Sequence, residues 1–242
     1  MQEDALHYKE RNVKQAIDLL MPSACKQALL LIMLLNVKSK KSSSSMKLNL
    51  VTEILLHQLE EEGAIEDAKN GDKKLKLLNL ERPTAELIYF LILGFQRKRI
   101  LEIGTSHGYS SLWFAQALLQ VKESQLLVTI ERELEKVQKA QQNFLRAGVS
   151  EKIKILQGDA TTVVATLEGT FDCVFFDADR LSAPEQLHLL LPKLEQNVLL
   201  LTDNVLSHPA EVAAYLMEFE KLPEFKTIIV PVGKGLHIAY RY

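Results

Sequence analysis

The feature that most constrains this chain is the stretch of residues 99–110, which joins an apolar strand to a helix through a turn with two glycines. Residues 100–103 have the composition of a buried strand, and residues 110–119 place their apolar side chains on one face of a helix. Gly104 and Gly108 allow a sharp turn and a close approach of the backbone, while free N–H groups at the helix start can donate to a ligand. The stretch therefore predicts a ligand-binding turn of an α/β sheet.

The residues in this turn indicate which kind of ligand it suits. A dinucleotide-binding turn follows Gly-x-Gly-x-x-Gly, and Ser106 stands where the second glycine is required, which disfavours a pyrophosphate. The carboxylate of Glu102, at the end of the strand, would repel phosphate but suits a ligand with a cationic amino acid portion. The arrangement Glu-x-Gly-x-x-x-Gly resembles the first motif of class I S-adenosylmethionine-dependent methyltransferases. A tight strand-to-helix turn without a ligand is the alternative.

Composition limits the function classes. The 242 residues include 47% hydrophobic side chains and 29 basic against 31 acidic residues, which predicts a globular chain without an electrostatic preference for nucleic acid or membranes. With only Cys25 and Cys173 present, we expect no disulfide framework and a reducing compartment. The longest apolar run, residues 28–35, is shorter than the roughly 20 residues that span a bilayer. We therefore expect a cytoplasmic protein with no membrane or nucleic acid partner.

Residues 1–45 differ from the rest of the chain and end in a Lys/Ser-rich stretch of linker composition. We interpret them as an N-terminal extension, and residues 46–242 as the functional domain. Within that domain, residues 46–94 are expected to form helices and residues 95–242 an α/β core. Two roles stay open for the apolar run at residues 28–35, which are packing on the core and forming the subunit interface of a homodimer.

Two helices are expected before the core. Apolar residues recur at helical spacing from residue 48 to residue 59, and Gly63 is placed to end this helix, with a polar loop over residues 64–74. A second helix begins near Pro83 and ends at Gly94. Because both precede the core, they could cover its ligand-binding edge.

Strands and helices then alternate. Further strands are predicted at residues 126–130, 153–156, 171–176 and 197–202, and helices at 133–147, 160–167 and 209–222. Two last strands, residues 225–230 and 236–242, are close enough in sequence to pair antiparallel. Because strand-helix-strand connections are right-handed, this order predicts a doubly wound, mostly parallel sheet that binds ligands at the carboxyl ends of its strands.

Acidic residues follow the strands at that edge, namely Glu102, Glu131, Asp159, Asp177 and Asp203. Glu131 is placed to accept hydrogen bonds from both ribose hydroxyls of a nucleoside. Asp159, with the following Ala160, would flank its adenine. Taken singly, each acid could instead be a solvated loop residue or a helix N-cap, but together they indicate a nucleoside site.

Asp177, Asp203 and Asn204 supply two carboxylates and an amide carbonyl, which are hard oxygen ligands suited to Mg²⁺ or Ca²⁺. The six histidines show no ligand-like spacing, which argues against zinc. N-caps and turns are the alternative roles for these three residues.

Four segments, residues 101–110, 128–131, 171–179 and 202–205, resemble the cation-dependent O-methyltransferases of the catechol and caffeoyl-coenzyme A group. The resemblance extends over residues 75–242, and Asp-Ala-Asp at 177–179 with Asp-Asn-Val at 203–205 is its most diagnostic part. It implies a seven-stranded, Rossmann-like methyltransferase sheet whose last strand is antiparallel. It also implies a cofactor site for S-adenosylmethionine and a divalent cation, with Mg²⁺ ahead of Ca²⁺ or Mn²⁺, on Asp177, Asp203 and Asn204.

The cofactor site that the resemblance implies consists of Leu80, Glu102, Gly104, Thr105, Ser110, Glu131, Ala160 and Asp177, and the turn and strand ends add Ser106, Gly108 and Asp159. The partner would be a small-molecule acceptor, best a vicinal dihydroxy aromatic, whose two hydroxyls a metal can hold.

Catalytic roles fall to Asp177 and Arg180. Members of the group carry Lys where this chain has Arg180, and often Tyr where it has Ala183. A guanidinium stays charged near neutrality, so Arg180 can fix charge but cannot act as a base. Two other functions stay open, which are a cofactor-binding protein of this fold without methyl transfer and an NAD-dependent oxidoreductase.

Overall fold

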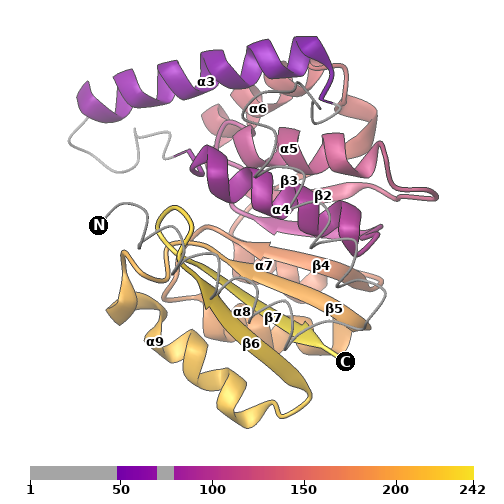
Figure 1. Cartoon of the computed structure of the whole chain (residues 1–242), viewed down its shortest axis with the longest axis vertical. Coiled ribbons are helices and arrows are strands. Elements are labelled where there is room, and N and C mark those ends of the chain that lie inside the picture. Colours follow the sequence, from indigo (N-terminus) through magenta and orange to yellow (C-terminus); the bar gives the residue numbers. More distant parts are fainter. Residues whose placement is uncertain (1–47, 70–78) are drawn as a thin grey trace, which may run out of the picture.

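The computed structural model describes residues 48–69 and 79–242, which form a seven-stranded sheet with helices on both faces (Figure 1). The strand order is β3-β2-β1-β4-β5-β7-β6, and β7 runs antiparallel to the other six strands. The strands are β1 (Ile100–Ile103), β2 (Leu127–Glu131), β3 (Ile153–Gln157), β4 (Phe171–Phe176), β5 (Leu194–Thr202), β6 (Phe225–Val230) and β7 (Leu236–Arg241). The predicted fold class is confirmed.

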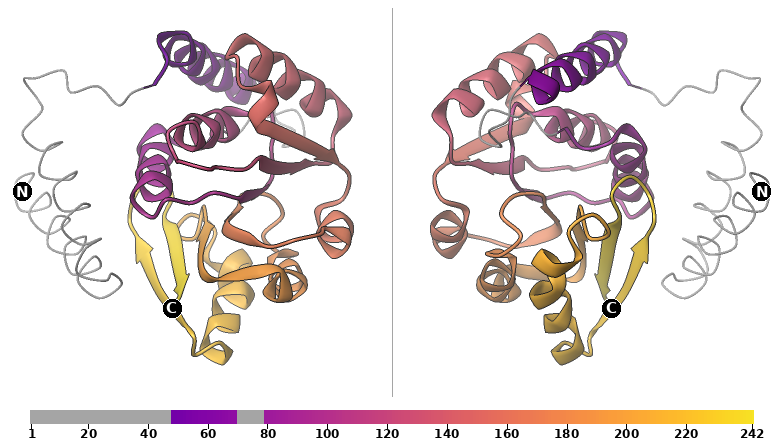
Figure 2. Two further views of the ribbon diagram at one scale, coloured as in Figure 1. Left: turned by 90° about the vertical axis from the view of Figure 1, so that its right-hand side faces the viewer. Right: turned by 90° about the vertical axis from the view of Figure 1, so that its left-hand side faces the viewer.

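The helices divide into two layers, as Figure 2 shows. One face carries α3 (Leu50–Lys69), α4 (Arg82–Gly94), α5 (Tyr109–Leu118) and α6 (Leu134–Arg146), and the other carries α7 (Ala160–Thr166), α8 (Ala183–Leu190) and α9 (Pro209–Glu218). The sequence analysis assigns no helix to the residues of α8. Among the described residues, no helix is long and apolar enough to cross a bilayer.

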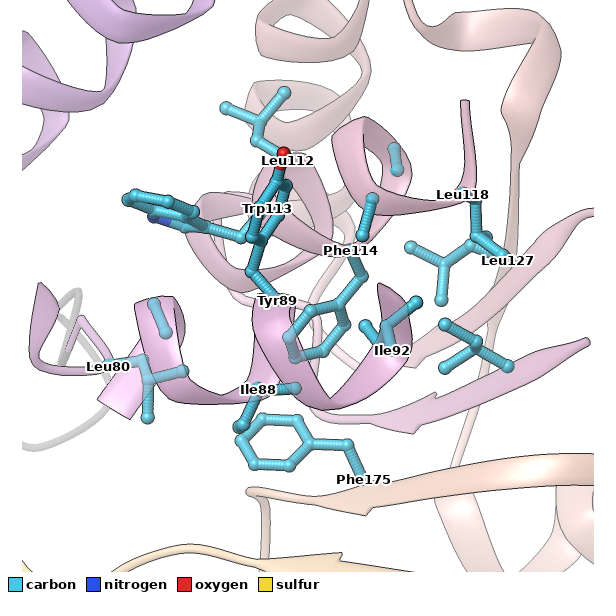
Figure 3. Close-up of a cluster of buried hydrophobic side chains, with 14 of the residues drawn as sticks. Leu80, Ile88, Tyr89, Ile92, Leu112, Trp113, Phe114, Leu118, Leu127 and Phe175 are labelled. Atoms are coloured by element: carbon cyan, nitrogen blue, oxygen red, sulfur yellow. The ribbon is translucent and has the colours of Figure 1, made fainter. Parts of the chain in front are cut away.

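Each face of the sheet has its own hydrophobic core. Figure 3 shows part of the first, where the Phe114 ring from α5 meets the Phe175 ring from β4 edge to face at 5.2 Å between centroids. In the second core, Tyr215 from α9 contacts Phe176 and Phe219 in the same layer. Alternate residues of the strands therefore face opposite cores, which explains why the central strands are apolar throughout.

The prediction that Gly63 ends the first helix is wrong, because α3 continues to Lys69. Gly63 is buried within α3, and a Cβ at this position would collide with the side-chain amide of Asn79. Asn79 in turn donates from Nδ2 to the carbonyl of Leu59 at 2.8 Å. The glycine thus admits a neighbouring side chain, and the expected loop is helical up to Lys69, while residues 70–74 lie outside the described residues.

The carboxyl ends of the parallel strands meet at one edge of the sheet. Because β6 runs parallel to this set and β7 antiparallel, the turn that joins them lies at the same edge. Of the described residues that precede β1, those that line the pocket described below are Asn79 and Leu80, just before α4, while α3 and α4 themselves cover a face of the sheet.

Candidate active site

A pocket of about 440 Å³ lies at the carboxyl edge of the sheet and contains most of the site residues predicted from the sequence. Those that line it are Leu80, Gly104, Thr105, Ser106, Ser110, Glu131, Asp159, Ala160, Asp177, Arg180, Asp203 and Asn204. Glu102 and Gly108 are not among the lining residues. The fold therefore brings predicted site residues that lie far apart in the sequence into one cavity. The positions of the two exceptions, Glu102 and Gly108, have physical reasons that are described next.

Glu102 lies behind the pocket wall, whereas the sequence led us to expect its carboxylate to face the ligand. Its carboxylate is fully buried and accepts hydrogen bonds from the hydroxyls of Ser110 (2.5 Å), Ser111 and Thr129 (2.7 Å). Burial raises its pKa to about 7 despite these three donors. Because Thr129 gives its single proton to Glu102, Thr105 must donate to the Thr129 oxygen 2.6 Å away. Glu102 thus orders hydroxyls of the wall.

The glycines of the turn allow close approach to protein atoms. Gly104 has φ 107°, and a Cβ there would collide with the Asp177 carbonyl oxygen. Gly108, at φ 93°, packs in the same way against the ring of Phe144. Both therefore need the left-handed conformation that glycine permits, and Gly108 shapes the entry to α5 from outside the pocket.

Glu131 has a fixed orientation at the tip of β2. Its Oε2 accepts the backbone N–H of Ser106 at 2.8 Å, and its Oε1 accepts those of Arg132 and Glu133 at 2.9 Å each. These bonds tie the glycine turn after β1 to the end of β2. The carboxylate still lines the pocket, with acceptor capacity left for a ligand hydroxyl.

Asp159 combines a pocket position with the helix-capping role that the sequence left open. Its Oδ1 accepts the backbone N–H of Thr162 at 3.1 Å and so caps α7. Asp159 and Ala160 both line the cavity next to Gly158. The cap therefore positions these residues without removing them from the site.

Asp177, Asp203 and Asn204 come together at the other end of the pocket. The amide of Asn204 donates from Nδ2 to Asp177 Oδ1 at 3.2 Å and to Asp203 Oδ2 at 2.9 Å. Burial raises the pKa of Asp203 to about 6, and burial together with the Asp203 charge raises that of Asp177 well above its usual value. Two acidic groups are thus held close in a setting that opposes their ionisation.

Within residues 48–69 and 79–242, no group of three or more His, Cys, Asp or Glu side chains gathers as a metal site. The predicted ligand set, Asp177, Asp203 and Asn204, contains two residues of these types and an amide. Asp203 Oδ1 is buried and has no hydrogen-bond partner in the described part of the chain. A buried oxygen atom that accepts no hydrogen bond, beside a second buried carboxylate, is suited to bind a cation. Asn204 contributes its carbonyl if the amide turns over.

Two cations line the same end. Arg180 donates from Nε to Glu211 Oε2 of α9 at 2.8 Å, and its side chain is 19% exposed. Lys234, from the turn between β6 and β7, lies 2.8 Å from Glu81 Oε1 through its Nζ and is 45% exposed. Arg180 was predicted from the sequence as a site residue, whereas Lys234 was not.

Other pocket residues were also missed, among them Asn79, His107, Tyr109, Gln186 and His208. His107 is nearly fully buried, and burial lowers its pKa to about 4. Tyr109 donates to Glu60 Oε1 at 2.6 Å and so links the pocket wall to α3. For Lys234 a signal was present, since antiparallel pairing of the last two strands places their turn at the ligand edge.

Comparison with known proteins gives consistent results. The family model described as O-methyltransferase matches residues 51–239. The chain is 35% identical over 115 residues to a catechol O-methyltransferase of Niastella koreensis, covering 46% of this chain and 51% of that protein. With a catechol O-methyltransferase of Mycobacterium tuberculosis the identity is 31% over 140 residues, covering 57% and 62%. The matches thus span between half and two thirds of these relatives.

Among solved structures, the O-methyltransferase TomG of Streptomyces achromogenes, involved in tomaymycin synthesis and determined in complex with SAM, is similar to this chain. The superposition has a TM-score of 0.65 at 27% identity and covers 85% of this chain and 96% of TomG.

Proposed function

Because the chain belongs to the O-methyltransferase family, we propose that it transfers a methyl group from S-adenosylmethionine to a small acceptor with two adjacent aromatic hydroxyls, assisted by a divalent cation. The observation that carries this proposal is the pocket itself, which joins Glu131 and the glycine turn at one end to Asp177, Asp203 and Asn204 at the other. A donor and an acceptor that react directly must share such a cavity. The catechol O-methyltransferases among the relatives support the acceptor class.

The proposed cofactor end is the part lined by Ser106, Ser110, Glu131, Asp159 and Ala160. S-adenosylmethionine, when bound, supplies a methyl group on a sulfonium, which is an electrophilic carbon. Glu131, already held by three backbone N–H groups, would accept from ribose hydroxyls with little loss of conformational freedom. The TomG structure, solved with SAM, supports this choice of cofactor.

The proposed acceptor end is the part lined by Asp177, Arg180, Asp203 and Asn204. A divalent cation there would supply Lewis acidity that orients two adjacent hydroxyls and favours ionisation of one. Asp177 and Asp203 would hold it with negative charge, and Asn204 with its carbonyl oxygen. We place Mg²⁺ first because all three donors are hard oxygens.

A bond forms between the acceptor oxygen and the methyl carbon while the bond between that carbon and sulfur breaks, and the sulfur keeps the electron pair as a neutral thioether. The acceptor hydroxyl loses its proton to solvent. The pocket walls must hold oxygen, carbon and sulfur near a line, which is the contribution that the rigid turn at Gly104 and the fixed carboxylates can make.

A screen of catechols tests the proposal. Purified protein is incubated with S-adenosylmethionine and each catechol, with Mg²⁺ or with a chelator, and methyl ethers are measured by mass spectrometry. We expect product that depends on Mg²⁺. Binding of S-adenosylhomocysteine with no product from any catechol would favour the cofactor-binding protein without transfer. The observation that favours this second candidate is the hydrogen bond from Arg180 to Glu211, which engages the guanidinium at the position where the family carries Lys. Calorimetry with NAD separates the oxidoreductase alternative, which predicts tight NAD binding.

A further inference from the structure

Lys234 occupies a defined position at the acceptor end. Its carbonyl accepts the backbone N–H groups of Leu206 at 3.0 Å and Ser207 at 3.2 Å, and the carbonyl of the next residue, Gly235, accepts that of Val205 at 3.1 Å. These bonds fasten the turn between β6 and β7 to the segment that directly follows Asn204. The backbone of Lys234 is therefore held beside the proposed cation ligands.

The two glycines around Lys234 make this placement possible. Gly233, at φ 54°, lies so close to Thr84 and Glu81 at the start of α4 that a Cβ would collide with both side chains. Gly235, at φ 95°, lies equally close to Leu206. The turn is thus wedged between α4 and the connection after β5, and its lysine side chain is directed along the pocket wall.

The ammonium of Lys234 keeps donors for a ligand. It has three N–H groups, and Glu81 is its one hydrogen-bond partner in the described part of the chain. Arg180, the other cation at this end, is less exposed and engaged by Glu211. Burial opposes the charge of Lys234, but the bond to Glu81 and the carboxylates of Asp203 and Asp177 raise its pKa above the usual value. Lys234 therefore stays a cation near neutrality.

We propose that Lys234 is a catalytic residue of this site, whose ammonium donates to the acceptor oxygen and stabilises negative charge on it. The inference rests on the proposed function, since it requires an acceptor with an ionisable hydroxyl. The ammonium keeps its own proton throughout, and the hydroxyl proton goes to solvent. The Lys234 ammonium would thus supply a fixed positive charge next to the acceptor oxygen, on which negative charge develops. This is the charge-fixing role that the sequence suggested for Arg180.

The ionisation of bound 4-nitrocatechol, read from its visible absorbance, tests this proposal without turnover. The protein is loaded with Mg²⁺ and S-adenosylhomocysteine, and the spectrum of the bound catechol is followed against pH. In Lys234→Met we expect ionisation at a pH higher by about one unit, the equivalent of losing one charge-assisted hydrogen bond. With S-adenosylmethionine, kcat/KM for catechols should fall by roughly 10- to 100-fold.

Lys226→Met is the matched control. Lys226 lies on β6 of the same hairpin, with its ammonium 5.7 Å from the ring centroid of Tyr242, and it does not line the pocket. The control removes the same charge and should leave both spectrum and kcat/KM at wild-type values. In Lys234→Arg, which keeps the charge, bound 4-nitrocatechol should ionise at a pH close to that of the wild type.

Glu81→Gln separates catalysis from a tethering role. If Lys234 only joins the hairpin to α4 through Glu81, both variants should lose activity equally. We expect Glu81→Gln to retain the wild-type ionisation of bound 4-nitrocatechol. Normal methyl transfer and a normal spectrum in Lys234→Met would overturn the inference alone, whereas a wild-type protein that methylates no catechol would overturn the proposed function and the inference with it.

Discussion

The two ends of the pocket are built on opposite electrostatic principles. At the cofactor end, buried or fixed carboxylates have their hydrogen bonds supplied by the protein, as with the three hydroxyls on Glu102 and the three backbone N–H groups on Glu131. At the proposed acceptor end, Asp203 Oδ1 is buried and has no hydrogen-bond partner among the described residues, and the pKa of the neighbouring Asp177 is raised by burial. The first end is preorganised by the chain itself, whereas the second holds two carboxyl groups whose ionisation burial opposes, which is why we propose a cation there.

Removal of a carboxylate from the proposed acceptor end should have the largest effect. Asp203→Ala should abolish Mg²⁺-stimulated turnover, a loss of at least about 100-fold, because a hard ligand is lost. Binding of S-adenosylhomocysteine, measured by calorimetry, should stay near the wild-type value. Asp159→Ala, which removes a carboxylate from the cofactor end, is the control and should keep the response to Mg²⁺. A normal, metal-dependent rate in Asp203→Ala would show that the ligand assignment is wrong.

Stability against pH distinguishes the two ends next. The folded-state pKa is raised from 4.5 to about 7 for Glu102 and from 3.8 to about 6 for Asp203. A carboxyl with a raised pKa binds more protons when folded, so the free energy of unfolding should fall as pH rises through these intervals, by on the order of 3 kcal/mol for each of the two carboxyl groups. Saturating Mg²⁺ should cancel the share of Asp203 and leave that of Glu102. Urea titrations across pH, with and without Mg²⁺, measure the contribution of each carboxyl group to the free energy of unfolding. If Mg²⁺ leaves the pH dependence of that free energy unchanged, the proposed cation does not bind Asp203.

A variant at the preorganised end should act on the cofactor alone. Glu131→Ala should weaken S-adenosylhomocysteine binding by ~1.5–3 kcal/mol, the usual cost of losing hydrogen bonds to a charged acceptor. Glu135→Ala, in the first turn of α6, is the matched control because Glu135 does not line the pocket. Unchanged affinity in the calorimeter would take Glu131 out of the cofactor site.

The smallest effect is expected from removal of residues 1–45. The described residues that line the pocket lie between Asn79 and Lys234, and we expect both ends to survive the truncation. We expect cooperative thermal melting and unchanged cofactor affinity for residues 46–242, the proposed methyltransferase domain. Loss of cooperative melting would indicate that the apolar run at residues 28–35 packs on the core or forms a subunit interface. The homodimer and the cytoplasmic location remain predictions from the sequence.

The parts of the fold and of the site that could be predicted from the sequence are those that depend on local signals. Strand positions, the doubly wound order and the acids at the strand tips follow from apolar runs and glycines, which are local signals. Most of the predicted site residues accordingly line the pocket. The direction of a side chain is not local, so Glu102 was expected to face the ligand, although three hydroxyls from α5 and β2 hold it behind the wall.

Contacts between distant segments were missed for the same reason. Gly63 looked like a helix end because the side chain that needs its space, Asn79, lies sixteen residues further along the chain. Lys234 was not singled out from the sequence, since its proposed role depends on Glu81 and Asp203 in other elements. Long-range packing decides these cases and outweighs local propensity.

The strand order β5-β7-β6 has a consequence for how the protein is made. β7 is last in the sequence but pairs with both β5 and β6, so β6 has no place in the sheet until β7 has been synthesised. Until then the edge of β5 presents unpaired backbone groups, a template for intermolecular pairing. During translation this edge exposes the nascent protein to aggregation, and chaperone protection would be useful there until β7 has paired.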